Sequence, residues 1–568
     1  MNTLIYPVIV FALIALFFMA MPELDKRDEL FCKHRLTRTD LLIMALITLV
    51  FGFVDFWNLG NTKSPESFAD FSRNTAEIQF DFPVSPKRIL LFSGVGTGEY
   101  TIEFSADGTD YAEGVSFHQD YAETLKWHSV DVSSDTDPIR YARIRADGTP
   151  YLGELAFLSE DGFAIPFSSN LPELNDEQDK LCTDDDFMNS SYFDEIYHAR
   201  TAWEHLHGIW PYEISHPPLG KIIIGIGISL FGMTPFGWRF SGVLFGVLML
   251  PVIYIFIRKL FGSTRSAACG TILLATDFMH YSHTRIATID TYVVFFILLM
   301  YLFMYLFLLE GERKYLALSG VAFGLGCASK WTGIYAGAGL AVIWLVYHIR
   351  HREVFLRNTG FSIIWFVLVP CVIYYLSYIP YGIALGITPV FSKEYLQKVI
   401  ENQQFMFTYH SGLVAEHPYS SQWYQWILDI RPILYYLKYY DDGTKSVFGT
   451  FSNPALCWGG LVAMICLIYT AVFRRDRQAA FILVGYLAQL VPWMFVKRLT
   501  FEYHYFPASI FLVLAMAYIF STMEKKKWMV YGFTALSVLL FIWFYPVLSG
   551  VPVSTSARIY GWLPTWPF

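Results

Sequence analysis

Long, nearly uninterrupted hydrophobic runs dominate the pattern of hydrophobic and polar positions along this chain. Twelve of them reach or approach the roughly 20 residues that a helix needs to cross the apolar core of a bilayer. They predict membrane-spanning helices over 3–21, 40–58, 236–257, 267–285, 289–309, 316–329, 332–347, 359–379, 455–473, 479–496, 505–522 and 529–547. We therefore expect a mainly α-helical, polytopic membrane protein with about twelve spans. The first run lacks a preceding basic residue and a small-residue cleavage site, so we expect it to be a retained span.

The basic residues in the short loops between these runs predict the orientation. Lys and Arg gather after alternate runs, a pattern typical of loops that face the cytoplasm. The clusters lie at 26–38, 258–265, 313–314, 350–357, 474–477 and 525–527. They fall on one face if the short, glycine-rich stretch 219–235 is a helix on the membrane surface. Both termini, and the long segments 60–217 and about 382–452, are then expected to be extracytoplasmic.

The first long outer segment begins with a different kind of pattern. Apolar and polar residues alternate in four short stretches, which predicts strands, and Asp-Gly pairs between them predict turns. The strands are expected at 76–82, 89–92, 99–104 and 140–144, and the turns at 107–108, 147–148 and 161–162. We expect an extracytoplasmic β-sandwich, in which YTIEFSADGTDY and IRYARIRADGTPYLGELAFL resemble discoidin-type or carbohydrate-binding jelly rolls.

Four parts follow from these patterns. The first two spans occupy 1–59 and the β-sandwich occupies 60–166. Residues 167–235 hold a polar linker, an outer loop and the surface helix. The remaining chain, 236–568, is a multi-span membrane domain with a large outer loop at about 382–452.

Composition narrows the class of protein. Of the 568 residues, 54% are hydrophobic and only 16% are charged, which excludes a water-soluble enzyme because so much apolar surface cannot be buried in a globule. The net charge of −8 excludes nucleic acid as the main partner, since such proteins need a basic surface. Seven scattered cysteines do not form a disulfide scaffold.

Polar residues gather at the predicted outer ends of the spans. Ionisable groups near a membrane are costly and are usually paired or functional. Each one alone has a plain alternative: a solvated surface acid, a loop-anchoring histidine or a snorkelling cation. As a set, they predict a polar site at the outer face. Its candidates are Asp194, Glu195, His216, Lys221, Arg239, Arg285, Asp290, Lys330, His417, Tyr419, Arg498 and His504.

Seven motifs, which contain all of these residues except Arg498, follow one another along the chain. They are FDEIYHAR, SHPPLGK, FGWRFSG, HTRIATIDTYVVFF, CASKWTG, HPYSSQWYQWILDIRPILYY and FEYHYFPASIFL. Over about 190–520 the chain resembles the bacterial branch of the protein O-mannosyltransferase family. More distantly, it is similar to bacterial transferases that move aminoarabinose from undecaprenyl phosphate to lipid A.

The resemblance implies a GT-C fold and a glycosyltransferase activity. The donor is expected to be a polyprenyl-phosphate sugar, with mannose as the sugar. The acceptor is expected to be a Ser or Thr hydroxyl of an exported protein, and transfer is expected to invert the anomeric carbon at the extracytoplasmic face of the cell membrane. The inserted 60–166 sandwich and the span at 3–21 depart from the eukaryotic relatives. An envelope glycan or lipid therefore stays open as the acceptor.

The resemblance also implies roles for the candidate residues. Asp194 is expected to be the base for the acceptor hydroxyl, because the first acid of this motif has that role, and Glu195 to orient it or to bind acceptor or metal. Polyprenyl phosphate is a good leaving group that needs cations. The candidates for its phosphate are Arg239, Arg285, Lys330, Arg498 and His504.

The other candidates have supporting roles. We expect His216 and His417 to position the substrate loops, and Asp290 to pair with Arg285. Lys221 and Tyr419 complete the predicted substrate-binding set. Asp194, Glu195 and His216 allow a divalent metal, although no ligand spacing demands one.

Two other classes of protein fit parts of the pattern. A transporter or flippase for lipid-linked sugars would also be polytopic, but it is expected to show paired repeats and mid-membrane charges. A receptor would explain the sandwich, but it needs one anchor and not about twelve spans. We therefore favour the enzyme.

Overall fold

The computed structural model describes residues 3–21, 34–133, 137–183, 185–387 and 389–568, so part of the first basic loop (22–33) lies outside the described residues. The chain forms two compact units. The membrane unit comprises Met1–Trp57, Gly208–Ile223 and Gly242–Phe568, and the sandwich unit comprises Asn58–His207 and Ile224–Ser241. The predicted part 167–235 is therefore divided between the two units.

All twelve hydrophobic runs are helical in the structure, as predicted. Nine helices of the described chain are long and apolar enough to cross a membrane, against about twelve expected. The longer helices are α2 (Arg38–Phe56), α5 (Pro235–Phe261), α8 (Asp290–Glu310), α10 (Gly333–Arg350), α16 (Pro454–Phe473), α17 (Arg477–Leu490), α18 (Phe506–Thr522), α19 (Lys527–Phe544), and α11 (Phe355–Ile363) joined to α12 (Val369–Leu376) by one π-helical turn. The chain is a multi-pass membrane protein.

Shorter helices complete the hydrophobic runs and connect them. The run 267–285 breaks at Thr276 and Asp277, which end one helix and begin the next. The stretch 219–235 contains a helix, α4, and its predicted place on the membrane surface stays a prediction. These helices are α1 (Ile5–Met19), α4 (Leu219–Phe231), α6 (Thr264–Ala275), α7 (Phe278–Thr284), α9 (Arg313–Ser329), α13 (Ile379–Ala384), α14 (Lys393–Gly412), α15 (Trp423–Trp426) and α20 (Pro546–Ser549).

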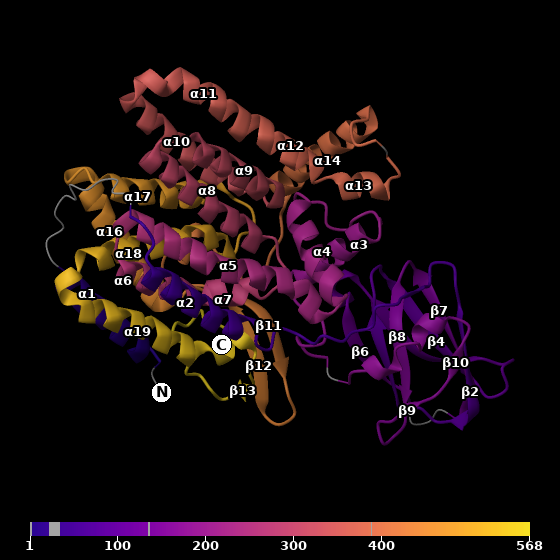
Figure 1. Cartoon of the computed structure of the whole chain (residues 1–568). Helices are drawn as coiled ribbons and strands as arrows, with labels where there is room; N and C mark the ends of the chain where they lie inside the picture. Colours follow the sequence, from indigo (N-terminus) through magenta and orange to yellow (C-terminus); the bar gives the residue numbers. More distant parts are fainter. Residues whose placement is uncertain (1–2, 22–33, 134–136, 184, 388) are drawn as a thin grey trace. The chain divides into compact units, whose positions relative to one another are not determined.

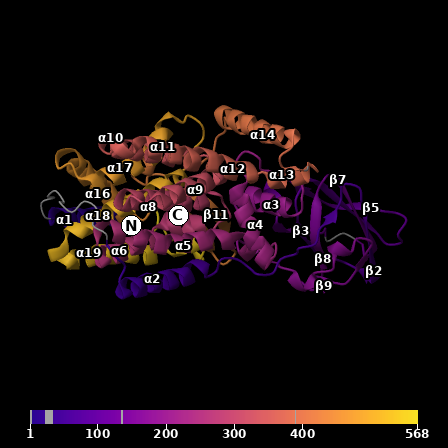
Figure 2. The same ribbon diagram turned by 45° about the horizontal axis from the view of Figure 1, so that its top comes forward.

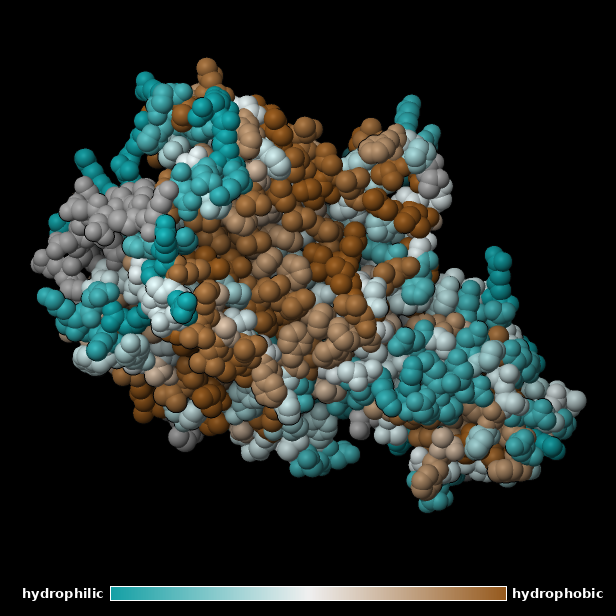
Figure 3. Space-filling model, viewed as in Figure 1, coloured by the Kyte–Doolittle hydropathy of each residue, from teal (hydrophilic) through white to brown (hydrophobic). Residues whose placement is uncertain are grey.

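Helix α18 forms the centre of the membrane unit. It is hydrophobic on every side, and Phe506 to Phe520 are all buried, which is the pattern of a helix enclosed by others. It packs against α6, α8, α16 and α17, while α9 packs against α8 and α12 (Figure 1 and Figure 2). The flanks of outer helices remain apolar and exposed, as at Leu49 and Phe53 of α2, which suits contact with lipid (Figure 3).

The predicted outer segment 382–452 has regular structure. It contains α14 and a hairpin of β11 (Ile433–Tyr439) and β12 (Thr444–Thr450), to which β13 (Val553–Ser554) adds a third antiparallel strand. Gly443, at φ +79°, allows the tight turn between the two longer strands. This segment supplies one wall of the site described below.

The sandwich unit contains two five-stranded antiparallel sheets. The first has the strand order β1-β8-β3-β6, and β9 also pairs with β8. The second has the strand order β10-β2-β7-β4-β5. Phe80, Phe157 and Leu155 are fully buried in its core. The four predicted strands are present as β2, β3, β4 and β7, and the other six were not predicted. Among these, β8 was missed because it is buried on both faces and does not alternate. The strands are β1 (Ala69–Asp70), β2 (Ala76–Val84), β3 (Arg88–Ser93), β4 (Gly98–Ser105), β5 (Ala112–Gln119), β6 (Lys126–Asp131), β7 (Ile139–Gly148), β8 (Tyr151–Leu158), β9 (Ala164–Ile165) and β10 (Ser168–Ser169).

The polar stretch 168–191 is not a free linker. Strand β10 pairs with β2, and Leu174 is fully buried in the sandwich core. The backbone N–H of Glu177 donates to the carboxylate of Glu154, and the amide of Gln178 donates to the carbonyl of Leu155. These contacts hold the stretch on the sheets. The resemblance to discoidin-type domains stays a prediction.

Candidate functional site

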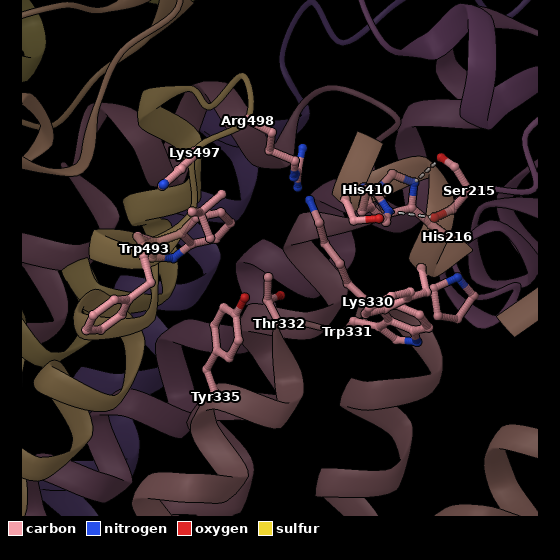
Figure 4. Close-up of a pocket in the computed structure, with 15 residues that line it drawn as sticks. Ser215, His216, Lys330, Trp331, Thr332, Tyr335, His410, Trp493, Lys497 and Arg498 are labelled. Atoms are coloured by element: carbon pink, nitrogen blue, oxygen red, sulfur yellow. Dashed lines mark hydrogen bonds between the residues drawn. The ribbon is translucent and has the colours of Figure 1, made fainter. Parts of the chain in front are cut away.

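A cavity of about 450 Å³ opens in the membrane unit where several predicted site residues meet (Figure 4). Four segments line it: the loop before α4, the junction of α9 and α10, the end of α14, and the stretch after α17. The lining residues are Ser215, His216, Pro217, Lys330, Trp331, Thr332, Tyr335, Phe407, His410, Ser411, Trp493, Phe495, Val496, Lys497 and Arg498.

Lys330 lies where α9 ends. Its extended backbone (φ −158°, ψ 140°) stops the helix, and its side chain is almost buried. The Nζ atom donates to both carboxylate oxygens of Asp290, at 2.7 and 2.8 Å. Asp290 thus pairs with Lys330, and the predicted pair with Arg285 is wrong. Arg285 instead donates to the carbonyls of Asp55 and Trp57 and is held by backbone.

Arg498 is the second cation at the cavity. Figure 4 shows its guanidinium and the Lys330 amino group pointing toward one another. Like charges at close range repel each other, so this arrangement favours an anion between the two groups. A guanidinium suits a phosphate in particular, because its planar fork matches two phosphate oxygens.

The loop that carries His216 is held by Glu213, a residue that the sequence analysis did not select. The Glu213 carboxylate lies 3.1 Å from His216 Nδ1 and accepts a hydrogen bond from the Ser215 backbone at 2.8 Å. Lys221 is fully buried and donates to the carbonyls of Glu213 (2.8 Å) and His216 (3.0 Å). Lys221 was predicted to contact substrate. The structure shows that it anchors this loop.

His410, from α14, is a histidine of the cavity that the sequence did not indicate. Its Nε2 atom donates to the carbonyl of Ser215 at 2.8 Å, while Nδ1 is buried without a hydrogen-bond partner among the described residues. Burial is the main cause that lowers the pKa of His410 to about 4, and the neighbouring His216 and Arg498 lower this pKa further. Burial also lowers the pKa of His216. Both imidazoles are therefore neutral at pH 7, and the charge at the cavity comes from Lys330, Lys497 and Arg498.

Glu195 and Arg239 form a closed ion pair inside the sandwich unit. The Arg239 guanidinium donates to both oxygens of Glu195 at 2.8 Å. Its other N–H groups donate to three backbone carbonyls, those of Leu59, Phe187 and Ser190. All five donors of the guanidinium are used. Arg239 therefore does not match its predicted contact with phosphate, and Glu195 does not match its predicted role toward acceptor or metal.

Asp194 precedes this pair and has different surroundings. It is the N-cap of α3 (Glu195–Leu206), is half-buried, and accepts no capping hydrogen bond from the first turn of that helix. Phe193, directly before it, has φ +49°, a left-handed conformation that is uncommon for a bulky residue. Such backbone outliers cluster at functional sites, where the surrounding structure maintains them.

Three predicted residues of the membrane unit are not part of the cavity lining, although the ring of His504 packs against the lining residue Trp493 at a centroid separation of 4.4 Å. His504 Nδ1 contacts the backbone of Phe501, and its ring stacks on Trp426 with a centroid separation of 6.0 Å. His417 Nδ1 accepts the backbone N–H of Tyr419 at 3.2 Å. None of His504, His417 and Tyr419 lines the cavity. Their observed contacts stabilise local turns.

The residues considered for a divalent metal do not form a ligand set around Glu195, because Arg239 occupies its carboxylate. Within the described residues, the group that could hold an ion is Glu154, Asp176 and Glu177, in the sandwich unit. Burial raises the pKa of Glu154 to about 7, and this carboxylate already accepts hydrogen bonds from Glu177 and Gln178.

The sequence signal for the missed residues was weak. Glu213 stands just before the SHPPLGK motif, and its importance comes from the buried amine of Lys221. His410 lies in a polar helix with no motif around it. A motif extended a few residues upstream would have included Glu213. The place of His410 at the cavity follows only from the packing of α14 against the loop at Ser215.

Comparisons with known proteins agree with the motif pattern. A model of the C-terminal four-transmembrane region of protein O-mannosyltransferases matches 395–566, and a model named dolichyl-phosphate-mannose-protein mannosyltransferase matches 215–376. Together the two matches cover more than half of the chain. Neither includes the sandwich strands.

Two relatives and one solved structure extend this result. The polyprenol-phosphate-mannose–protein mannosyltransferase of Mycolicibacterium smegmatis is 28% identical over 453 residues, which cover 66% of this chain and 87% of the relative. Its counterpart in Mycobacterium tuberculosis is 26% identical over 452 residues, covering 66% and 86%. The Saccharomyces cerevisiae Pmt1-Pmt2 complex bound to the sugar donor superposes with a TM-score of 0.59 at 14% identity, covering 66% of this chain and 89% of that one. The expected GT-C fold is confirmed.

Proposed function

The chain belongs to the protein O-mannosyltransferase family, and from that premise we propose that it moves mannose from a polyprenyl-phosphate carrier to a Ser or Thr hydroxyl of an exported protein. The relatives from two mycobacterial species carry names that state this donor and a protein acceptor. We place the protein in the cell membrane, with its active site on the extracytoplasmic face.

The cavity of the membrane unit carries the proposal. Lys330 and Arg498 point toward one another there, and the neighbouring His216 and His410 are neutral. When the bond between sugar and phosphate breaks, negative charge grows on the departing polyprenyl phosphate. Cations placed beforehand at that point stabilise the transition state more than the ground state.

The reaction needs one more group. The acceptor oxygen attacks the anomeric carbon, the bond from that carbon to the phosphate oxygen breaks, and the electron pair leaves with the phosphate. A single displacement inverts the anomeric carbon. The proton of the acceptor hydroxyl goes to a base, and we assign this role to Asp194 from its place in the family motif and the strained backbone at Phe193.

Helix directions support the orientation. Helix α10 begins near the cavity, at Tyr335, and ends in the basic cluster at Arg350, while α17 begins in the basic cluster at Arg477. The basic clusters thus lie at the helix ends away from the cavity. Because basic loops face the cytoplasm, the cavity belongs to the opposite side.

A reconstituted transfer assay tests the proposal. The purified chain in lipid nanodiscs receives polyprenyl-phosphate mannose and a Ser/Thr-rich peptide, and mass spectrometry follows the peptide. We expect mannosylated peptide, and we expect Arg498→Ala to weaken donor binding. Lys398→Ala removes an exposed α14 charge outside the cavity and is the matched control.

Two outcomes would contradict this assignment. Transfer to an envelope glycan or lipid, with the peptide unmodified, would exclude the protein acceptor. Movement of the intact donor across the bilayer without transfer would favour the flippase alternative.

A further inference from the structure

A second cavity lies in the membrane unit and takes no part in the proposed reaction. Its volume is about 490 Å³, and α8, α10, α16 and α17 form its walls together with the loop between α16 and α17. The lining residues are Tyr305, Leu308, Val342, Ile343, Val346, Tyr347, Arg350, His351, Ala471, Arg475, Asp476, Arg477, Gln478, Ala480, Phe481 and Val484.

This cavity lies at the opposite end of the helices that reach the first one. On α10, Tyr335 lines the first cavity and Arg350 lines the second. At 1.5 Å per residue, about 22 Å of helix separates them. Helix α17 also connects the two cavities: Arg477, at its start, lines the second cavity, and Trp493, just after its end, lines the first. The two cavities therefore open toward different faces of the membrane.

The lining of the second cavity is amphipathic. Arg350, Arg475 and Arg477 supply positive charge at the helix ends. Further along α10, the wall becomes apolar, and Val342 and Val346 are 50% and 49% exposed on the flank of that helix. A ligand that matches this lining has an anionic head and an apolar chain.

Among the described residues, no ion pair joins these three arginines to the acids near them. Asp476 is buried, its carboxylate accepting the N–H of Ala479 (2.9 Å) and the hydroxyl of Tyr518 (3.0 Å). The Glu353 carboxylate lies 3.6 Å from His351, but its side chain is 70% exposed and therefore well screened by water. The arginines keep their charge available to a ligand.

Two further features indicate that this cavity is a preformed binding site. Arg475 has φ +56°, a conformation that glycine adopts more easily, so the loop keeps an arginine there at a conformational cost. Gln478 is buried, and its side-chain oxygen has no hydrogen-bond partner among the described residues, although its nitrogen donates to Leu260. That oxygen is able to accept a hydrogen bond from a hydroxyl of a ligand.

We propose that this cavity binds the phosphate head group of an anionic phospholipid from the adjacent leaflet, with an acyl chain along α10. Basic pockets between membrane helices bind such head groups through charge-assisted hydrogen bonds. The apolar wall distinguishes this ligand from free phosphate. The proposal does not depend on the transferase activity.

Native mass spectrometry of the full chain measures the bound lipid directly. The detergent-solubilised protein is titrated with phosphatidylglycerol and, separately, with phosphatidylcholine of the same acyl chains. We expect selective retention of phosphatidylglycerol. Arg475→Gly suits the backbone at that position, so it removes the charge without strain, and we expect affinity to fall about fivefold, since one such arginine contributes about 1 kcal/mol. The combined variant Arg350→Gln with Arg477→Gln should lose more.

The control is Arg357→Gln, which removes an exposed charge of α11 outside the cavity and should leave retention unchanged. A thermal melt confirms that each variant is folded. Equal retention of both lipids by the unmodified chain would overturn the proposal. So would an equal loss in the Arg357→Gln control, or displacement of the bound phosphatidylglycerol by millimolar inorganic phosphate alone.

Discussion

Two buried cations of this protein, Arg239 and Lys330, had the same predicted role toward phosphate, but they differ in how fully their ion pairs and hydrogen bonds occupy them. In the sandwich unit, Arg239 uses all five N–H donors on Glu195 and three carbonyls. In the membrane unit, Lys330 pairs with Asp290 but still borders a cavity opposite Arg498. A cation whose donors are all bound internally is a structural element, whereas one that borders a cavity remains able to meet a ligand.

The neighbouring acids Asp194 and Glu195 show the same contrast between a ligand-facing and a structural residue. Glu195 is fully buried and is the partner of Arg239, whereas Asp194 is half-buried and follows the strained Phe193. The Glu195–Arg239 pair holds the start of α3 through bonds to Phe187 and Ser190. In this arrangement, Glu195 positions the segment that presents Asp194.

The largest expected effect is a loss of transfer rate when Asp194 is changed. Asp194→Asn keeps the size of the side chain but removes the basic oxygen, so single-turnover transfer should fall on the order of a hundredfold to ten-thousandfold. Donor affinity and the melting temperature should stay close to those of the unmodified chain. Transfer at the normal rate would place the base elsewhere.

Loss of the buried pair should act on folding first. Arg239→Ala removes the cation that contacts both oxygens of the buried Glu195 carboxylate, and breaking a buried ion pair typically costs about 3–5 kcal/mol of stability. We expect a strongly lowered melting temperature for Arg239→Ala and a nearly unchanged one for Arg498→Ala, measured in the same detergent. Equal melting temperatures for the two variants would remove the distinction between structural and ligand-facing cations.

A smaller effect concerns pH. The pKa of His410 is about 4 in the folded chain, below its ordinary value near 6.5. Below pH 6.5 the unfolded chain binds the additional proton, so the stability that depends on neutral His410 is lost as pH falls from 6.5 toward 4.

His410→Gln should make this loss shallower, since the glutamine amide can still donate to the Ser215 carbonyl without titrating. Melting temperatures at pH 7 and pH 5 measure the difference between the variant and the unmodified chain. Parallel decreases in both proteins would show that other groups control the acid response.

The sequence by itself determined the layout of the elements and the family. The hydrophobic runs that predict spans are local patterns, and each folds as helix because an apolar segment in lipid must satisfy its own backbone. Alternation likewise revealed four sandwich strands, and it failed at β8, whose two faces are both buried. Motif order was sufficient to identify the family that the comparisons confirm.

Only the tertiary structure decided which candidate residues have donors or charge left for a ligand. The carbonyls of Leu59, Phe187 and Ser190 that saturate Arg239 come from distant parts of the chain, and no spacing along the sequence predicts them. The partner of Asp290 was misassigned for the same reason. Hydrogen-bond satisfaction depends on which groups packing brings within about 3 Å, a three-dimensional property that residue type and periodicity do not contain.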